Sequence, residues 1–208
     1  MLDELQIFED LEQGTPEWHA ARCGVVTASE FSTVLMKGRG GAPSETRKKL
    51  MACKAAEILS GKPVQTFAGN AYTALGHELE PEIRALYEST CEHDVTQVGF
   101  MRRGRIGCSP DGVISDGQGL FEAKSCQPHI QIDRLLARVL PEEHKAQVMG
   151  QLLVSGRSYV DYVSYSPGLP ELRVRVYRDL PYLSTLNQEL QLFIRELDAL
   201  VAQIKAMA

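Results

Sequence analysis

The sequence has few of the features that mark membrane proteins and proteins that coat nucleic acids. No uncharged apolar stretch of the 208-residue chain approaches the roughly eighteen residues that suggest a membrane span. The acidic start, Met1–Leu5, lacks the basic end of a signal peptide. The net charge of −5 argues against a uniformly positive surface, and a site that holds cations would need part of this acidity. We therefore expect a soluble intracellular protein without membrane contact.

Paired cysteines and internal repeats are also absent. The five cysteines are an odd number, lie far apart and include no C-x-x-C pair, which excludes a disulfide framework and a zinc ribbon. We interpret them as small, reduced, apolar residues. With 44% hydrophobic residues and no repeat, the chain can bury one sizeable core. We therefore expect residues 1–208 to form a single domain with one site.

Helix-capping residues and the periodicity of apolar residues predict helices along most of the chain. One helix should start where Thr15 precedes Pro16, and another where Thr27 caps and Glu30 completes a capping box. Residues 37–43 form a loop by composition, and further helical patterns cover about 44–60, 69–89 and 141–155. At about 181–207, apolar residues recur at three- and four-residue steps and predict a long amphipathic helix packed on the core. These are Leu183, Leu186, Leu190, Phe193, Leu197, Leu200 and Ile204.

The β-prone part of the sequence lies between and after these helices. Short runs separated by glycine-rich turns fill residues 93–126, where we predict an antiparallel meander. Two further strands are expected at 159–165 and 171–177, and the second alternates apolar and basic residues as a half-buried strand does. Helices and strands together predict an α/β (α+β) protein.

The stretch 107–124 carries the strongest chemical signal. Glu122 and Lys124 are two residues apart in a β-prone run, so both project to one face, and Ala123 can offer its carbonyl. A hairpin turning near 116–117 would bring Asp111 alongside them. These hard oxygen ligands suit Mg²⁺ or Mn²⁺ rather than zinc, and the lysine could orient or deprotonate a nucleophile. The alternative is a simple turn at Asp111 and an exposed Glu122–Lys124 ion pair.

Two other positions could complete such a site. His77, Glu80 and Arg84 lie on one face of a predicted helix, where a histidine and a carboxylate could complete a metal shell. A solvated helix with an ion pair between Glu80 and Arg84 is the alternative. Gln147 is a polar residue in a fairly apolar helix, so it either bonds to a neighbour or faces a cleft.

Four motifs follow one another along residues 13–165. They are Trp18-x3-Arg22-x-Gly24-x2-Thr27-Ala28-Ser29, Gly76-x3-Glu80, Ser109-Pro110-Asp111-Gly112 followed by Glu122-Ala123-Lys124, and Ala146-Gln147-Val148. The ordered set is more specific than any one motif. Together the motifs resemble the lambda exonuclease family, the YqaJ-like phage recombination nucleases of the PD-(D/E)xK superfamily.

The resemblance implies a fold and an activity. The fold would be an α/β (α+β), restriction-endonuclease-like core with a central mixed β-sheet flanked by helices, in a single nuclease domain over 1–208. The enzyme would need Mg²⁺, with Mn²⁺ as a substitute and two ions per active site. It would degrade one strand of linear double-stranded DNA from 5′ to 3′, releasing mononucleotides and leaving 3′ overhangs for a single-strand annealing recombinase. A toroidal homotrimer is implied, acting in the cytoplasm of a bacterial host cell and encoded by a phage or prophage.

The resemblance also assigns residues. Asp111, Glu122 and the Ala123 carbonyl would hold the catalytic metals, with Glu80 as a further acidic contributor and Lys124 as the catalytic lysine. A second set would bind the terminal 5′-phosphate, because a guanidinium, hydroxyls and an amide are all phosphate donors. These residues are Arg22, Ser29, Ser109 and Gln147.

Alternatives to these assignments stay open. Arg22 and Ser29 could serve only a helix-turn, with Ser29 as part of a cap. The resemblance implies that Arg39 contacts duplex DNA; the alternative is that it lies in a flexible linker without function. The chain could instead be a structure- or site-specific endonuclease of the same superfamily, or a catalytically idle module that binds DNA ends.

Overall fold

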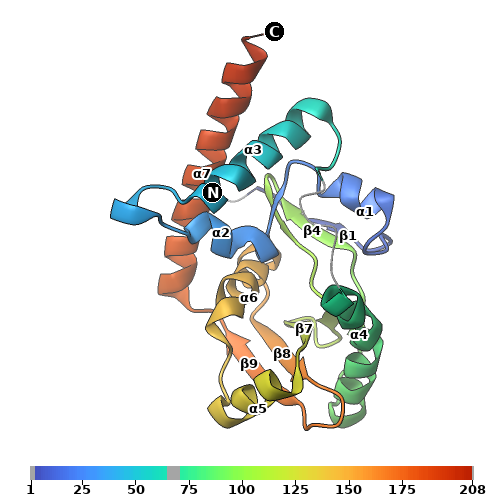
Figure 1. The fold of residues 1–208 in the computed structure, drawn as a ribbon. Helices are drawn as coiled ribbons and strands as arrows, with labels where there is room; N and C mark the ends of the chain where they lie inside the picture. The colour runs from blue at the N-terminus through green and yellow to red at the C-terminus, as the bar shows by residue number, and fades with distance from the viewer. Residues whose placement is uncertain (1–2, 65–70, 208) are drawn as a thin grey trace.

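The computed structural model describes the backbone of residues 3–64 and 71–207, with the side chains of 71–75 and 77 left outside the description. Two β-sheets and the helices around them make up the fold (Figure 1). The helices are α1 (Pro16–Ala21), α2 (Phe31–Leu35), α3 (Glu45–Ser60), α4 (Ala71–Thr90), α5 (Pro128–Ala137), α6 (Glu142–Ser155) and α7 (Leu180–Lys205), with short 3-10 turns η1 (Ala28–Glu30) and η2 (Arg39–Gly41).

A mixed five-stranded sheet forms the centre, in the order β3-β6-β7-β8-β9. Its strands are β3 (Val95–Thr96), β6 (Gly112–Ile114), β7 (Gly119–Ser125), β8 (Tyr159–Tyr165) and β9 (Leu172–Tyr177). Strands β7 and β8 are parallel and the other pairs antiparallel. β8 is buried along almost its whole length, as expected for an inner strand covered on both faces. This sheet and its helices match the expected architecture.

A second, four-stranded sheet has the order β1-β4-β5-β2, from β1 (Gln6–Phe8), β4 (Phe100–Arg103), β5 (Ile106–Cys108) and β2 (Val26–Thr27). The meander predicted over 93–126 is therefore wrong. β4 and β5 form a hairpin in this sheet, whereas β6 and β7 form a hairpin in the five-stranded one. The chain changes sheets at Ser109–Asp111, where Pro110 has no N–H to donate to a ladder.

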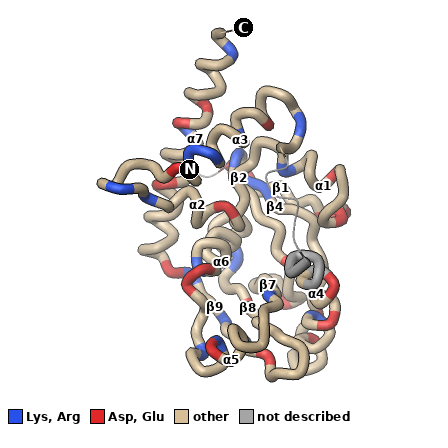
Figure 2. The backbone as a smooth tube through the Cα atoms, in the orientation of Figure 1, with Lys and Arg blue, Asp and Glu red and all other residues tan. Residues whose placement is uncertain are grey.

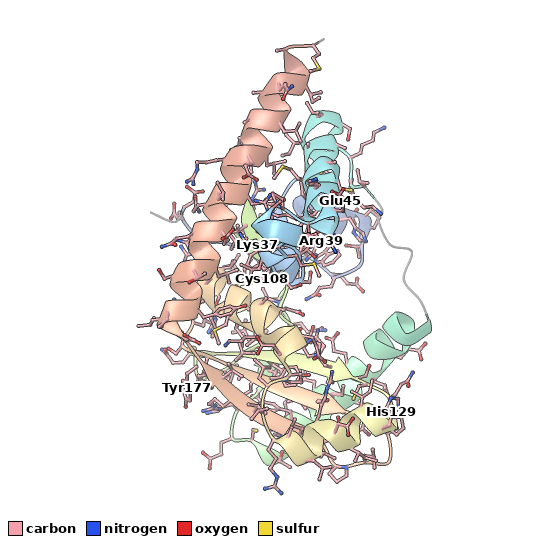
Figure 3. All side chains as sticks on the ribbon, turned by 60° about the vertical axis from the view of Figure 1, so that its left-hand side comes forward. Lys37, Arg39, Glu45, Cys108, His129 and Tyr177 are labelled. Atoms are coloured by element: carbon pink, nitrogen blue, oxygen red, sulfur yellow. The ribbon has the colours of Figure 1, made fainter. Side chains whose placement is uncertain are left out.

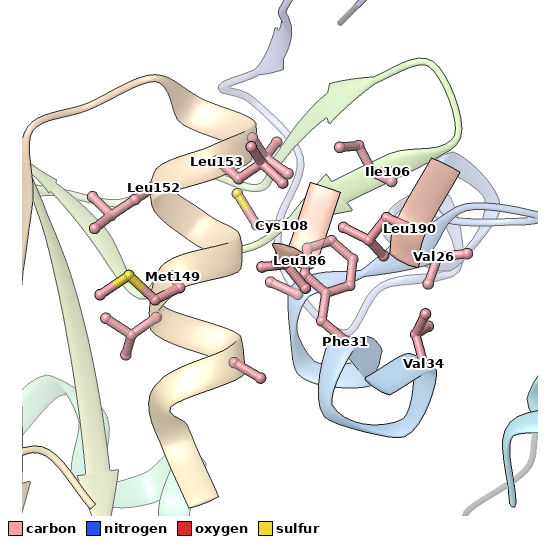
Figure 4. Packing of buried hydrophobic residues seen from close by; sticks show 14 of the residues in the cluster. Val26, Phe31, Val34, Ile106, Cys108, Met149, Leu152, Leu153, Leu186 and Leu190 are labelled. Carbon is pink, nitrogen blue, oxygen red and sulfur yellow. The ribbon is translucent and has the colours of Figure 1, made fainter. Parts of the chain in front are cut away.

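Helix α6 lies in the main core, with the five-stranded sheet on one side and the N-terminal helices on the other. From Ala146 to Ser155 every residue except Gln147 is buried, which fits a helix that is enclosed on nearly all sides. Figure 4 shows Met149 and Leu152 on one side of this helix, and Phe31 and Leu186 in the packing beyond its other side. Helix α4 covers the other face of the sheet, where Tyr87 packs against Phe121.

The C-terminal helix α7 follows the predicted apolar stripe with one exception. Five of the expected residues are buried and Leu200 is partly buried, but Ile204 is 40% exposed and Val201 takes the last buried position. The end of α7 extends past the rest of the fold in Figure 1, which agrees with the exposure of residues at this end of the helix. No helix within the described residues combines the length and apolarity needed to cross a bilayer.

Candidate active site

The β6–β7 hairpin brings Asp111 to the end of β7, as the sequence predicts. Gly117, at φ +74°, and Asp116 make the turn, and Oδ1 of Asp116 accepts the N–H groups of Gln118 and Gly119 at 2.8 and 3.0 Å. Oδ2 of Asp111 accepts the N–H of Ala123 at 2.7 Å. This bond fixes the Asp111 carboxylate beside the strand that carries Glu122 and Lys124.

Three side chains hold Glu122 in the interior. Lys124 Nζ and Gln147 Nε2 both lie 2.5 Å from its Oε1, and Gln151 Nε2 lies 2.5 Å from its Oε2. Glu122 is 1% exposed and the Lys124 side chain 28%. The alternative of an exposed surface ion pair is therefore wrong. A buried carboxylate held by a lysine and two amides is typical of a site in which the orientation of that carboxylate matters.

The electrostatics of this group are those of two acids that share one buried site. Burial, and then the negative charge of Glu122, raises the pKa of Asp111 well above its usual range. Burial disfavours the charged form of Lys124, but the Glu122 and Asp111 carboxylates outweigh it and raise the pKa of the ammonium. Lys124 is therefore a cation held between two acids.

The donor chemistry fits a hard divalent cation. In the described part of the chain, no three or more His, Cys, Asp and Glu side chains converge to hold a metal. Mg²⁺, however, is usually held by one or two carboxylates together with waters and substrate phosphates. Asp111 and Glu122 supply that pair, the Ala123 main chain adds a carbonyl, and a bound cation would relieve the repulsion that raises the pKa of Asp111.

Glu80 stands slightly apart from this pair. Its Oε1 accepts from Arg84 Nη2 at 2.8 Å, which is the helix ion pair considered as the alternative from the sequence. Its charge nevertheless contributes to the raised pKa of Asp111. The side chain of His77 lies outside the described residues.

A cavity of about 140 Å³ opens next to Glu122 and brings together the other predicted residues. All four residues expected to bind a 5′-phosphate line it, although they come from the C-cap of α1, from η1, from α6 and from the link between the two sheets. The lining consists of Gln13, Trp18, Arg22, Thr27, Ala28, Ser29, Ser109, Gln147 and Gln151. Gln147 and Gln151 belong both to this lining and to the shell around Glu122.

Arg22 is fixed in the cavity on three sides. Its guanidinium lies 3.9 Å from the centre of the Trp18 ring, and it donates to Ser109 Oγ at 3.0 Å and to Thr27 Oγ1 at 3.3 Å. Burial lowers the pKa of Arg22, while the nearby Glu30 carboxylate raises it. Among the described residues the guanidinium donates only these two hydrogen bonds, so its other N–H groups can meet an anion. The alternative, that Arg22 serves only a helix-turn, does not account for these long-range contacts.

Ser109 and Ser29 have different surroundings. Ser109 Oγ donates to the Gly99 carbonyl at 2.7 Å and accepts from Trp18 Nε1 at 3.0 Å. Ser29 is exposed, and its hydroxyl lies 3.2 Å from that of Thr27. Ser109 therefore helps to orient Arg22 and Trp18, whereas Ser29 presents its hydroxyl at the open side of the cavity.

Two glycines allow the walls of the cavity to approach each other. A Cβ on Gly150 would overlap the Phe31 ring and lie 3.2 Å from the Ala28 Cβ, so only glycine lets α6 pack this closely on η1 and α2. Gly24, at φ +70°, faces Ile58 of α3, where an added Cβ would lie 2.6 Å from Cγ1. Both contacts hold the segment Arg22–Ser29 against the rest of the cavity.

Arg39 lies away from the cavity, in the exposed turn η2. Figure 3 shows it near Lys37 and Glu45, on the side of α2 and α3. The neighbouring Lys37 forms an ion pair with Glu189 at 2.8 Å. Along the backbone tube in Figure 2, Lys and Arg are interspersed with Asp and Glu in most elements.

Sequence reasoning missed two residues of this site. Gln151 is four residues after Gln147, on the same face of a helix that is otherwise apolar, and this spacing was the available signal. Gln13 donates to the carbonyls of Val98 and Pro110, both at 3.0 Å, and so ties the N-terminal segment to the link between the sheets. No local pattern marks Gln13.

Comparison with known proteins agrees with this geometry. Residues 17–158 match the model of the YqaJ-like viral recombinase domain. The chain is 32% identical to an alkaline exonuclease, LHK-Exo, from Laribacter hongkongensis, with 93% of this chain and 97% of that chain covered and a TM-score of 0.83. The same values hold for LHK-Exo in complex with dAMP. A phage-related exonuclease from Haemophilus somnus 129PT, 16% identical, with 86% of this chain and 96% of that chain covered, shares the fold at a TM-score of 0.60. No match was found among curated proteins.

Proposed function

Because the chain belongs to the family of YqaJ-like viral recombinase domains, we propose that it is a Mg²⁺-dependent 5′→3′ exonuclease. It degrades one strand of linear double-stranded DNA to mononucleotides and leaves 3′ single-stranded overhangs for recombination by single-strand annealing. The observation that carries this proposal is the position of Gln147. Its amide lines the cavity of Arg22 and also donates to Glu122, so an anion in the cavity lies next to the buried carboxylates.

The carboxylate group is the catalytic part of the site. Asp111, Glu122 and the Ala123 carbonyl would hold Mg²⁺, or Mn²⁺ in its place, with Glu80 as an outer contributor to a two-ion site. When bound, the metal supplies a water of lowered pKa and neutralises charge on the scissile phosphate. Lys124 orients the nucleophile and stabilises the charge that develops on the phosphate oxygens. Gln151 and Gln147 keep the Glu122 oxygens in one orientation.

The cavity is the end-binding part. Arg22 meets the terminal 5′-phosphate with its free N–H groups, and Ser29, Ser109 and Gln147 complete the set of donors. Gln147 and Gln151 lie between the cavity and the carboxylates. A 5′ end bound in the cavity therefore places the adjacent phosphodiester next to Glu122. That arrangement releases one nucleotide at a time from the 5′ end. LHK-Exo has been crystallised with dAMP, a nucleoside monophosphate of the kind proposed here as product.

The assembly and the partners belong to the same proposal. One nuclease domain spans the chain, three copies form a toroid around the duplex, and Arg39 contacts the DNA backbone. A single-strand annealing recombinase receives the 3′ overhang, in the cytoplasm of a bacterial host cell infected by or carrying the phage. Light scattering of the pure protein tests the trimer, because a mass other than three times 23.0 kDa would contradict it.

The decisive experiment compares three DNA substrates, with and without Mg²⁺: linear duplex with 5′-phosphate, linear duplex with 5′-hydroxyl, and closed circles. The proposal expects Mg²⁺-dependent release of mononucleotides from linear DNA, fastest with a 5′-phosphate. Cutting of closed circles would contradict it in favour of an endonuclease. Binding without turnover would leave only the function of an end-binding module.

A further inference from the structure

A group of buried charges lies behind the cavity without lining it. Lys54 Nζ of α3 lies 3.0 Å from Glu30 Oε1 and 3.4 Å from Glu57 Oε2. The side chains of Lys54 and Glu57 are each 8% exposed. Burying a lysine and a glutamate costs desolvation free energy that close ion pairs only partly offset. Packing alone therefore does not explain why these two charged side chains are buried.

A continuous chain of contacts connects this group to Arg22. Glu30 Oε2 accepts both the N–H of Thr27, at 2.8 Å, and its hydroxyl, at 3.0 Å. Thr27 Oγ1 in turn accepts from Arg22 Nη2 at 3.3 Å. The hydroxyl proton of Thr27 can therefore point at Glu30 while its lone pairs face Arg22. Lys54 holds the carboxylate that orients Thr27, and Thr27 orients the guanidinium.

A second contact fixes the backbone on the other side of Arg22. Glu57 Oε2 accepts the N–H of Gly24 at 2.9 Å, in the turn that follows Arg22. Glu57 Oε1 accepts the N–H of Val64 at 3.2 Å. Lys54 therefore pairs with both carboxylates that support the segment 22–30.

The charges of this group balance only when Lys54 is counted. Arg22 and Lys54 are cations, and Glu30 and Glu57 are anions, so the sum is zero. Without Lys54 the sum would be −1, and the two carboxylates would repel an anion that enters the cavity beside Arg22. In a partly desolvated site such a change is felt strongly, because effective dielectric screening is weaker than in water.

We propose that Lys54 is a positioning residue that determines selectivity for a 5′-phosphorylated end. It touches neither phosphate nor metal. It neutralises Glu30 and Glu57, so that Arg22 dominates the potential in the cavity, and it holds the Glu30–Thr27 contact that orients Arg22. This inference rests on the proposed function of the cavity and deepens it by naming what sets the preference.

The test is the ratio of kcat/KM for linear duplex with a 5′-phosphate to that with a 5′-hydroxyl, at one Mg²⁺ concentration. Lys54→Met should lower this ratio roughly tenfold, because the added repulsion acts only on the phosphate. The double variant Lys54→Met/Glu57→Gln removes one charge of each sign and should restore most of the ratio. Lys49→Met, an exposed lysine on the same helix, is the matched control and should leave the ratio unchanged.

A purely structural role for Lys54 would lower both rates equally and leave the ratio unchanged in Lys54→Met; that result would overturn the inference. A lowered ratio that the double variant fails to restore would also overturn it. If Lys54→Met fails to fold, the single variant Glu57→Gln provides the test. It leaves the four-residue group with a net charge of +1 and should raise the ratio. An unchanged or lower ratio in this variant rejects the inference. A wild-type ratio of one would overturn the proposed cavity function itself. A high wild-type ratio that none of these variants moves would overturn only the role of Lys54.

Discussion

Gln151 donates its side-chain amide to Oε2 of Glu122 deep in the interior of the protein, 2.5 Å from nitrogen to oxygen. Gln147, one helical turn earlier, does the same for Oε1. The Gln151 carbonyl oxygen is itself buried and has no hydrogen-bond partner among the described residues. A polar group buried at such a cost is expected to have a function, and here it holds the orientation of a proposed metal ligand.

Replacing Gln151 with methionine should therefore impair catalysis more than end recognition. Methionine keeps the length of the side chain but removes the donor, which leaves one Glu122 oxygen unpaired. Loss of such a supporting contact typically lowers metal affinity or activity by about 10- to 100-fold. Exonuclease rates measured across a Mg²⁺ titration should show the loss, with the preference for 5′-phosphate retained. Unchanged kinetics at every Mg²⁺ concentration would show that Gln147 alone suffices.

Asp111→Asn should separate activity from stability. The amide keeps an oxygen that can accept the Ala123 N–H, but it cannot supply a carboxylate, so activity should fall by at least about 1,000-fold on linear DNA. Because burial and Glu122 raise the pKa of Asp111, removing that charge should stabilise the metal-free protein by roughly 1–2 kcal/mol at pH 7–8. Urea unfolding in EDTA measures this difference, and a less stable variant would contradict the electrostatic account.

Local patterns were enough to predict that Asp111, Glu122 and Lys124 lie together. The two-residue alternation of a strand and a single hairpin turn place Asp111, Glu122 and Lys124 together, and the structure has that hairpin. The expected PD-(D/E)xK core is confirmed by the likeness to LHK-Exo. Helix starts at Thr15 and Thr27 also hold, because a cap depends on three or four neighbouring residues.

Contacts between distant segments could not be predicted in the same way. β5 pairs with β2, far upstream, rather than with β6, so the meander was wrong although most of its β-prone runs contain strands. Helix α5 and strand β1 were not predicted at all. The cavity combines residues from four separate segments, and only the family resemblance grouped them. Propensity describes neighbours in sequence, whereas these features depend on tertiary packing.

Arg22→Lys should weaken recognition of the 5′-phosphate although the charge is kept. The guanidinium donates to Ser109 and Thr27 at once while its carbon lies over the Trp18 ring, and an ammonium cannot reproduce a planar fork. We expect the preference for 5′-phosphate over 5′-hydroxyl ends to fall by about 10- to 100-fold, since bonds to charged groups are worth roughly 1.5–3 kcal/mol. Competition binding of duplexes with a 5′-phosphate or a 5′-hydroxyl, in Ca²⁺, measures this preference. A preference fully retained in the lysine variant would mean that the site recognises only the charge of the side chain's partner and not the geometry of the guanidinium.

Gly150→Ala tests how closely the cavity walls must pack. The new Cβ would overlap the Phe31 ring and press on Ala28, so α6 must move away from η1 and α2. Overpacking of this kind typically costs about 1–3 kcal/mol, and the shift would also separate Gln147 from Ser29 across the cavity. Thermal unfolding and end-selectivity should therefore change together. Ser184→Ala, at an exposed position of α7, serves as a surface control, and a Gly150 variant as stable as this control would contradict the packing.

His144 should make the stability of the protein sensitive to mild acid. Burial, followed by the positive charges of Lys124 and Arg134, lowers the pKa of His144 to about 4, with Glu143 opposing them. Its Nε2 lies 3.1 Å from Arg134 Nη2, where a neutral ring can accept the bond. The folded state therefore favours neutral histidine, whereas the unfolded chain takes up a proton near pH 6.5. The stabilisation is complete above about pH 6.5 and is lost as the pH falls towards 4.

His144→Gln removes the titration but keeps an acceptor for Arg134. The free energy of unfolding of the wild type should fall relative to this variant between about pH 6.5 and 4, by at most about 3 kcal/mol. Carboxylates such as Asp111 titrate in both proteins, so their effect cancels in the difference between the two curves. Urea unfolding at half-unit pH steps supplies both curves. If they run parallel over this range, His144 is not held neutral by its burial and by the two cations, and the electrostatic description of the environment around Lys124 would have to change.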